Sequence, residues 1–179
     1  MKKTFIILLT VAFTIASVIC TGCAKPEADG KTEAASSVIS FKTQEINGKD
    51  IDSAELFADN KITAINIWAS WCGPCVNELP ELQKLSSELE ALDCRLISIL
   101  YDGDADSGVK AGKQLIDQAG LTYAVLLPND SVRSQFSIRY FPTTVFVDSS
   151  GRLVGEPIIG AQVDEYLPAV QRLLEQKER

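Results

Sequence analysis

Two cysteines separated by two residues, Cys72 and Cys75, are the residues of this chain best suited to chemistry. They lie in the segment Trp71-Cys72-Gly73-Pro74-Cys75, and a pair with this spacing can close a small disulfide. A bridge across two residues closes almost no loop, so it contributes little to the stability of a fold. The spacing therefore indicates thiol–disulfide exchange.

Zinc binding and structural bracing are the two alternative interpretations of the pair. A structural zinc ion needs four ligands, and the chain contains no histidine. No metal site is therefore expected. A purely structural disulfide is disfavoured by the small loop that it would close.

The neighbouring elements are predicted to place Cys72 where a buried strand ends and a helix begins. Residues 61–70 are a nearly continuous apolar run, which predicts a strand. Residues 76–91 predict a helix with four leucines on one face: Leu79, Leu82, Leu85 and Leu89. At a helix N-terminus the macrodipole and the free backbone N–H groups favour an anion, which lowers the pKa of a thiol there. We therefore expect Cys72 to be a nucleophile at neutral pH.

The N-terminal segment has the features of a secretory signal. Met1-Lys2-Lys3 is basic, and the apolar run that follows, 5–19, is too short and interrupted to predict a membrane span. Thr21-Gly22-Cys23 resembles a bacterial lipobox, although Cys20 stands where an aliphatic residue is usual. We predict a lipoprotein signal peptide over 1–22 and lipidation of Cys23; a plain cleaved signal or an uncleaved anchor is the alternative.

Composition divides the rest of the chain into a tether and one domain. Residues 23–37 are small, polar and charged without apolar periodicity, which predicts a flexible lipid-anchored tether. Residues 38–179 are long enough for a single domain with a core of its own. The formal net charge of −7 makes a nucleic-acid partner unlikely and disfavours attraction to an anionic membrane surface. The lipid must then hold the protein at the membrane.

Local patterns predict an alternation of strands and helices. The series begins with a hairpin over 38–51 that turns at Asn47-Gly48. The elements expected after it are a helix over 53–58, a strand over 62–69, a helix over 75–91, a strand over 95–100, a helix over 109–119, a strand over 123–127, a helix over 131–136, a hairpin of 143–147 with 153–159, and a helix over 163–176. This order favours a largely parallel sheet covered on both faces and closed by an antiparallel edge.

Two further features have ordinary structural interpretations. The loop 102–108 carries acids at three positions of a calcium-loop pattern, but Ser107 and Lys113 occupy its glycine and glutamate positions. We expect a solvated loop that caps the following helix. Cys94 begins an apolar strand, and a free cysteine packs well as a small buried group.

At this point the chain resembles a known family. The run from Ile67 to Cys75, with Pro80 after it, resembles thioredoxin, and Phe141-Pro142-Thr143 resembles the thioredoxin cis-proline loop. Glu78, within Cys75-Val-Asn-Glu-Leu-Pro, is similar to the glutamate of the TlpA/ResA-like extracytoplasmic thiol–disulfide oxidoreductases. The resemblance implies a thioredoxin-like three-layer α/β fold with a mixed sheet and an N-terminal hairpin. It also implies a central helix–strand insertion, here about 109–127.

The resemblance also assigns roles to individual residues. It implies that Cys72 attacks and Cys75 resolves, and that Glu78 accepts the proton. Thioredoxin has a buried aspartate for this last task, but Asn66 stands in its place and cannot ionise. An exposed helical glutamate is the alternative for Glu78. The implied substrate-binding residues surround the cysteines and form the cis-proline loop: Trp71, Gly73, Pro74, Phe141 and Pro142.

The function implied is reduction of disulfides in secreted or membrane-associated proteins by a lipid-anchored enzyme on the extracytoplasmic face of the bacterial cell membrane. No cofactor is expected, the protein is expected to be a monomer, and a CcdA- or DsbD-type membrane protein would supply electrons. Substrates in such families include the haem-attachment cysteines of apocytochromes c and oxidised repair enzymes.

Three alternatives remain open from the residues. A disulfide oxidase or isomerase tends to carry a residue such as histidine between its cysteines, whereas Gly73-Pro74 matches the reducing thioredoxins. A peroxiredoxin-like peroxidase would need threonine or serine three residues before its cysteine, where this chain has Ala69. A non-enzymatic binding lipoprotein is disfavoured because both cysteines and the glutamate are present.

Overall fold

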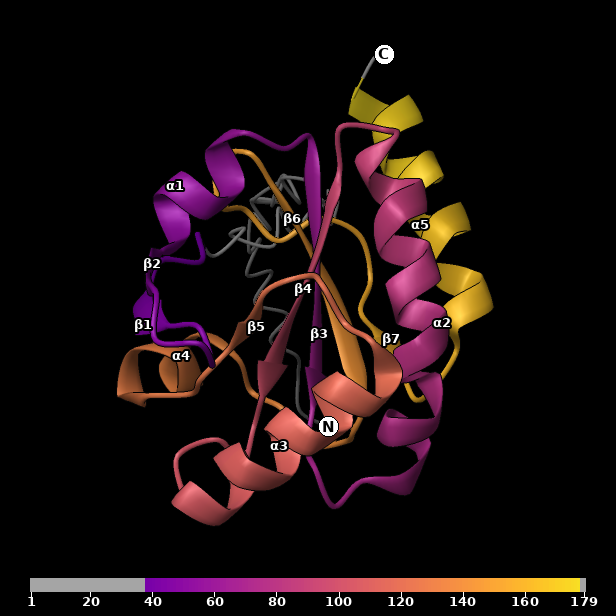
Figure 1. Cartoon of the computed structure of the whole chain (residues 1–179). Coiled ribbons are helices and arrows are strands. Elements are labelled where there is room, and N and C mark those ends of the chain that lie inside the picture. Colours follow the sequence, from indigo (N-terminus) through magenta and orange to yellow (C-terminus); the bar gives the residue numbers. More distant parts are fainter. Residues whose placement is uncertain (1–37, 178–179) are drawn as a thin grey trace, which may run out of the picture. The chain divides into compact units, whose positions relative to one another are not determined.

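A five-stranded mixed β-sheet organises the computed structural model, which describes residues 38–177 (Figure 1). The predicted signal peptide, the tether and Cys23 lie outside the described residues. The strands stand in the order β5-β4-β3-β6-β7. Their bounds are Ile62–Trp68 for β3, Arg95–Leu100 for β4, Val125–Leu126 for β5, Thr143–Asp148 for β6 and Ile158–Ile159 for β7.

The direction of the strands agrees with the expectation. β3 pairs in parallel with β4, and β4 with β5, whereas β6 runs antiparallel to both β3 and β7. The closing hairpin of β6 and β7 forms the predicted antiparallel edge of the sheet, with β6 directly beside β3. The mixed, three-layer α/β architecture itself is confirmed.

The central strand β3 explains why the sheet is covered on both faces. All seven of its residues are buried. Because side chains alternate along a strand, Ala64 and Trp68 pack into one hydrophobic cluster and Ile65 and Ile67 into another. A strand buried on both sides reads as a continuous apolar run, which is the pattern seen in the sequence.

Helices and a hairpin form the two outer layers (Figure 1). On one face lie α2 (Gly73–Glu90), α5 (Val163–Lys177) and the inner side of α3 (Asp106–Ala119). On the other face lie the hairpin of β1 and β2, α1 and α4. Their bounds are Lys42–Gln44 for β1, Asp50–Asp52 for β2, Ser53–Ala58 for α1 and Asp130–Gln135 for α4.

The predicted N-terminal hairpin is present and protects one edge of the sheet. Its turn contains Gly48 at a φ of 92°, a conformation that glycine adopts readily. Beyond the β1–β2 pairing, the backbone N–H of Ile46 donates to Val125, and that of Leu127 donates to Gln44. The outer edge of β5 is thereby hydrogen-bonded and less open to pairing with other chains.

Four elements differ from the sequence-based expectation by two residues or more. α3 begins at Asp106, three residues early. α2 begins at Gly73, two residues early, because Cys72 caps it. β5 keeps only two of the five expected residues. The return strand 153–159 is reduced to β7 and one bridge, Leu153 to Val147. The residues between them, 154–157, include Gly155 at a φ of 67° and a proline, which has no N–H for a ladder.

The acidic loop before α3 does not cap that helix, contrary to the expectation. Ala105 is the N-cap of α3 and makes no side-chain hydrogen bond. α3 instead packs tightly on the loop, since a Cβ at Gly108 would lie 1.9 Å from the carbonyl oxygen of Asp102. Only glycine fits there. The Asp102 side chain is turned toward the segment before Cys72 and bonds to Ser70.

Candidate active site

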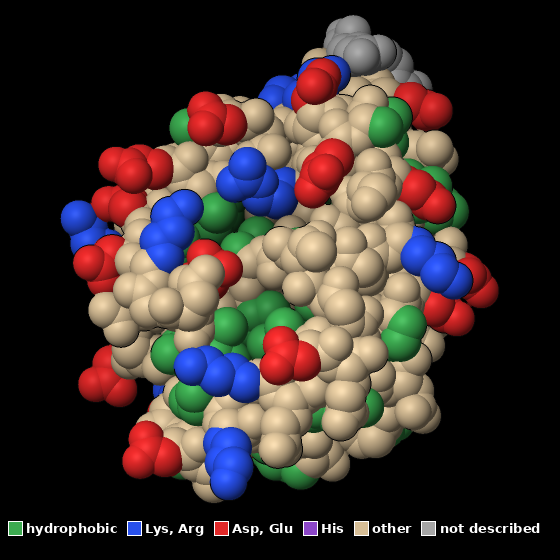
Figure 2. All heavy atoms as spheres, viewed as in Figure 1, with side chains coloured by type: hydrophobic (Ala, Val, Ile, Leu, Met, Phe, Trp, Pro, Cys, Tyr) green, Lys and Arg blue, Asp and Glu red, His purple; other side chains and the backbone are tan. Residues whose placement is uncertain are grey.

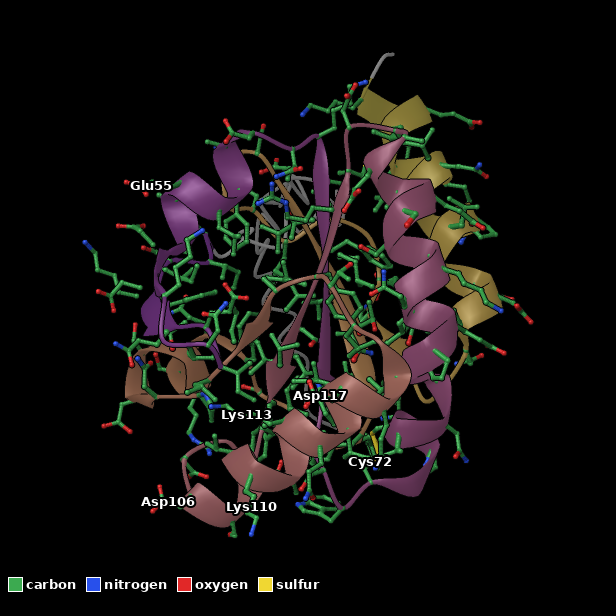
Figure 3. The ribbon with its side chains drawn as sticks, viewed as in Figure 1. Glu55, Cys72, Asp106, Lys110, Lys113 and Asp117 are labelled. Carbon is green, nitrogen blue, oxygen red and sulfur yellow. A yellow bond between two sulfur atoms is a disulfide. The ribbon has the colours of Figure 1, made fainter. Side chains whose placement is uncertain are left out.

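Cys72 and Cys75 form a disulfide at the junction of β3 and α2 (Figure 3). The expected position of Cys72 is confirmed: it is the N-cap of α2, and its sulfur accepts a hydrogen bond from the backbone N–H of Cys75 at 3.3 Å. Cys72 retains 6% exposure, whereas Cys75 has none. An attacking sulfur must reach its partner, so the geometry favours Cys72 for that step.

Gly73 and Pro74 provide the first turn of α2 and are both exposed. Proline suits the start of a helix because its missing N–H would be unpaired there anyway. A Cβ at Gly73 would meet nothing within 4 Å, so no steric contact requires glycine. The two residues leave an open surface beside Cys72.

The cis-proline loop contacts the segment that carries the cysteines. The peptide bond between Phe141 and Pro142 is cis, as predicted. The ring of Phe141 meets that of Trp71 edge to face, with 5.5 Å between centroids. Trp71 directly precedes Cys72 and is 67% exposed. The structure thus brings together two predicted substrate-binding segments that are far apart in the sequence.

An aromatic series continues from this contact toward α4. Phe141 also packs on Tyr101 at 4.8 Å between centroids, and the guanidinium carbon of Arg133 lies 4.4 Å from the centre of the Tyr101 ring. Arg133 further donates to the Tyr101 carbonyl and to Asp104, both at 2.8 Å. Tyr101 and Arg133 were not predicted from the sequence, because nothing local links them to the cis-proline loop.

Asp102 restrains the segment before Cys72 from the end of β4. Its carboxylate accepts hydrogen bonds from the backbone N–H of Ser70, at 3.0 Å, and from the Ser70 hydroxyl. Hydrogen bonds to an ionised carboxylate are stronger than those between neutral groups. Asp102 is therefore a candidate for holding Trp71 and Cys72 in place.

Glu78 is buried, at 4% exposure, rather than on the helix surface. It lies three residues after Cys75 and thus on the same side of α2. Its Oε1 accepts a hydrogen bond from the Asn66 side-chain amide at 2.9 Å, and the Tyr166 hydroxyl lies 3.5 Å from its Oε2. Asn66 also donates to the Thr144 hydroxyl at 3.1 Å.

Burial raises the pKa of Glu78 from 4.5 to about 7. Removal of water from around the carboxylate is the main cause, and the nearby Glu81 adds to it, whereas hydrogen bonds from Asn66 and Tyr166 act in the opposite direction. Burial, with the neighbouring charge of Glu78, likewise raises the pKa of Tyr166 to about 12. A carboxyl group with a pKa near 7 can both accept and return a proton at neutral pH.

Sequence reasoning missed Tyr166, which contacts Glu78, and Thr144, which contacts Asn66. Thr144 stands directly opposite Asn66 in the β3–β6 pairing, so its side chain faces the same side of the sheet. Tyr166 comes from α5, 88 residues from Glu78. Helical periodicity indicated that α5 has an inner face, but gave no sign of what that face would contact.

The other predicted features fall outside this arrangement. Cys94 is buried and free, as expected, and lies directly before β4; burial raises the pKa of its thiol. Within residues 38–177 no group of three or more histidine, cysteine or acidic side chains is placed to hold a metal ion. Acidic and basic side chains are interspersed on the face shown in Figure 2, around a hollow in which apolar side chains are visible.

Comparison with known proteins identifies the family of this chain. The model of the AhpC/TSA family matches residues 34–155. The chain belongs to the AhpC/TSA family. The chain is 29% identical over 128 residues to thiol–disulfide oxidoreductase ResA of Bacillus thuringiensis, and the alignment covers 71% of this chain and 70% of ResA. The thioredoxin-like protein YneN of Bacillus subtilis is 28% identical over 94 residues, with 52% and 54% covered.

Solved structures show that this AhpC/TSA family member has a thioredoxin-like fold. A thiol:disulfide interchange protein of the thioredoxin family from Chlorobium tepidum superposes with a TM-score of 0.64 at 22% identity, covering 75% of this chain and 93% of that one. StoA from Bacillus subtilis superposes with a TM-score of 0.60 at 22% identity, covering 74% and 96%. The resemblance to TlpA/ResA-like proteins and the enzyme class, thiol–disulfide oxidoreductase, are confirmed.

Proposed function

We propose that the protein reduces disulfides in secreted or membrane-associated proteins on the extracytoplasmic face of the bacterial cell membrane, where a lipid on Cys23 tethers it. The observation that carries the proposal is the Cys72–Cys75 disulfide at the N-terminus of α2, with Cys72 at its accessible end. A dithiol with Gly-Pro between its cysteines matches the reducing thioredoxins.

The reduced enzyme begins the reaction with the thiolate of Cys72. This thiolate attacks one sulfur of a substrate disulfide, and the other substrate sulfur leaves as a thiolate that takes up a proton. Cys75 then loses its proton and attacks the sulfur of Cys72, which releases the second substrate thiol. Two electrons pass to the substrate, and the enzyme is left with the Cys72–Cys75 disulfide.

Glu78 is the proposed acceptor of the Cys75 proton. Cys75 is fully buried, so bulk water does not reach its thiol directly. Glu78 lies one helical turn away and has a pKa of about 7, which suits proton transfer near neutral pH. Asn66 of β3 donates a hydrogen bond to one oxygen of the carboxylate, and the Tyr166 hydroxyl of α5 lies near the other. These two contacts orient Glu78.

The proposals for the location of the protein and for its electron donor rest on the sequence. The lipobox-like Thr21-Gly22-Cys23 supports the tether. Residues 38–177 contain no helix that could span a membrane. A disulfide oxidoreductase from Mycobacterium tuberculosis, described as secreted, superposes with a TM-score of 0.60 at 23% identity, covering 75% of this chain and 96% of that one. A CcdA- or DsbD-type membrane protein would return the electrons, since each turnover leaves the enzyme oxidised.

Catalysed reduction of insulin by dithiothreitol tests the proposal. We expect the wild-type protein to accelerate reduction of the interchain disulfides and Cys72→Ser to lose the acceleration. Cys94→Ser is the matched control, because it removes a cysteine that forms no disulfide, and it should keep the activity. Equal activity in Cys72→Ser and the wild type would refute the assignment.

The peroxidase alternative has a specific test, since the matched family model bears the AhpC/TSA name. Ala69 occupies the position where such a peroxidase would need a hydroxyl, and it is fully buried. We therefore expect consumption of hydrogen peroxide with dithiothreitol to stay at the level of Cys72→Ser. Rapid peroxide turnover that depends on Cys72 would favour the peroxidase instead.

A further inference from the structure

An apolar groove lies beside the cis-proline loop, on the face of the sheet opposite α2. Its volume is about 260 Å³. Apolar side chains from the loop after α4 and from β6, β7 and their connection make up most of its lining: Phe136, Ile138, Tyr140, Val145, Leu153 and Ile159. Arg139 is the one charged residue that lines it.

The groove exists because the outer layer is incomplete on this face. Val145 and Val147 of β6 both point toward the layer of the hairpin and α1. Val147 is completely buried by that layer, but Val145 is only half-buried. The six-residue helix α4 ends at Gln135, and the irregular segment that follows does not cover the strand.

The groove adjoins the cis-proline loop, which in turn contacts the segment that carries Cys72. Tyr140 and Thr143 line the groove and flank Phe141 and Pro142, which form the rim of the disulfide site through the contact with Trp71. A polypeptide bound against the cis-proline loop is therefore also next to two residues that line the groove.

Exposed apolar side chains gather at the same place. Within the described residues, four large hydrophobic side chains are exposed, and three of them flank this loop: Trp71 at 67%, Tyr140 at 64% and Ile159 at 51%. The fourth is Val38, at the start of the described chain. Contiguous exposed apolar surface on a soluble domain marks a site of interaction.

We propose that this groove binds one large apolar side chain of the substrate polypeptide, so that the enzyme prefers cysteines flanked by such a residue. The inference rests on the proposed function and names its substrate class. The volume is below the roughly 300–1,000 Å³ of small-molecule sites, which fits a single side chain better than a cofactor. The lining offers contact to an apolar side chain but only one charge, so an aliphatic or aromatic residue is the matching occupant.

The test uses peptides in single-turnover reduction by the pre-reduced protein. Each nonapeptide carries a central cysteine in a mixed disulfide with mercaptoethanol, and one phenylalanine is moved through the other positions of a Gly/Ser background. Every rate is normalised to reduction of bis(2-hydroxyethyl) disulfide by the same variant, because this probe has no side chain to fill the groove.

We expect phenylalanine to raise the normalised rate about tenfold or more. The increase should occur on one side of the cysteine only, and there only at every second position. Every second position is expected because successive side chains of an extended segment point to opposite faces. Ile159→Ser, which shortens an exposed wall, and Ser137→Trp, which fills the groove from an exposed position, should both remove the preference. Val38→Ser, an exposed apolar residue outside the groove, should keep it.

Each other outcome overturns the inference in a distinguishable way. Reduction of every peptide at a similar rate, or a preference that survives both groove variants, refutes the groove and leaves the proposed function standing. Failure to reduce the small disulfide as well refutes both. A dimer that Ile159→Ser dissociates would assign the groove to a second copy of the chain, and so would contradict its use by substrate.

Discussion

Replacement of Glu78 by glutamine should change how stability depends on pH. Glu78 is 4% exposed, and its pKa is raised from 4.5 to about 7, chiefly by burial. Between these two values the folded protein holds a proton on Glu78 that the unfolded chain has lost. The contribution of Glu78 to the unfolding free energy of the wild type therefore falls as pH rises from 4.5 to about 7, and this loss is complete above the folded-state pKa.

The size of the effect follows from the same pKa difference. At about 1.4 kcal/mol per pH unit, the interval between 4.5 and about 7 corresponds to about 3 kcal/mol. Glu78→Gln keeps the shape of the side chain and cannot ionise. The difference in unfolding free energy, variant minus wild type, should then rise by about 3 kcal/mol between pH 4.5 and pH 8.

Urea denaturation of the oxidised proteins, followed by circular dichroism at several pH values, measures this difference. Glu88→Gln is the matched control, because Glu88 is an exposed residue of the same helix. Its difference from the wild type should stay nearly constant across the range. If the difference for Glu78→Gln were equally constant, the pKa of Glu78 would be the same in the folded and unfolded chain, and its use as a base near neutral pH would be refuted.

Three further predictions concern the reaction and the tether. Cys75→Ser should accumulate mixed disulfides with substrates whereas Cys72→Ser should not, as non-reducing electrophoresis would show; the reverse pattern would exchange the roles of the two cysteines. Glu78→Gln should slow turnover by up to about 10²-fold and shift the pH dependence of cysteine alkylation, because the groups are coupled; an unchanged rate and alkylation profile would reject the proton-transfer role. Labelled fatty acid should enter the wild type and not Cys23→Ala, and equal labelling of both would contradict lipidation at Cys23.

Local patterns predicted the elements that carry the cysteines. The apolar run of β3 and the leucine face of α2 each depend on neighbouring residues, and the bounds of α1 and β4 agree with the expected ranges. The pair Cys72–Cys75 needed no long-range information, since a separation of three residues lets the disulfide form within one helical turn.

The surroundings of the site depend on contacts that no local pattern encodes. Tyr166 approaches Glu78 only because α5 packs beside α2, and Asp102 reaches Ser70 only because β4 ends next to β3. Pairing partners, rather than elements, were therefore the part that sequence reasoning could not supply.

The reduction potential of the Cys72–Cys75 couple tests the central claim most directly. Equilibration of the protein with glutathione or dithiothreitol redox buffers, followed by separation of the oxidised and reduced forms, gives the value. A reductase should lie near thioredoxin's potential of about −270 mV rather than near that of the oxidant DsbA, about −120 mV. A value above about −180 mV would contradict the account and favour a disulfide oxidase or isomerase.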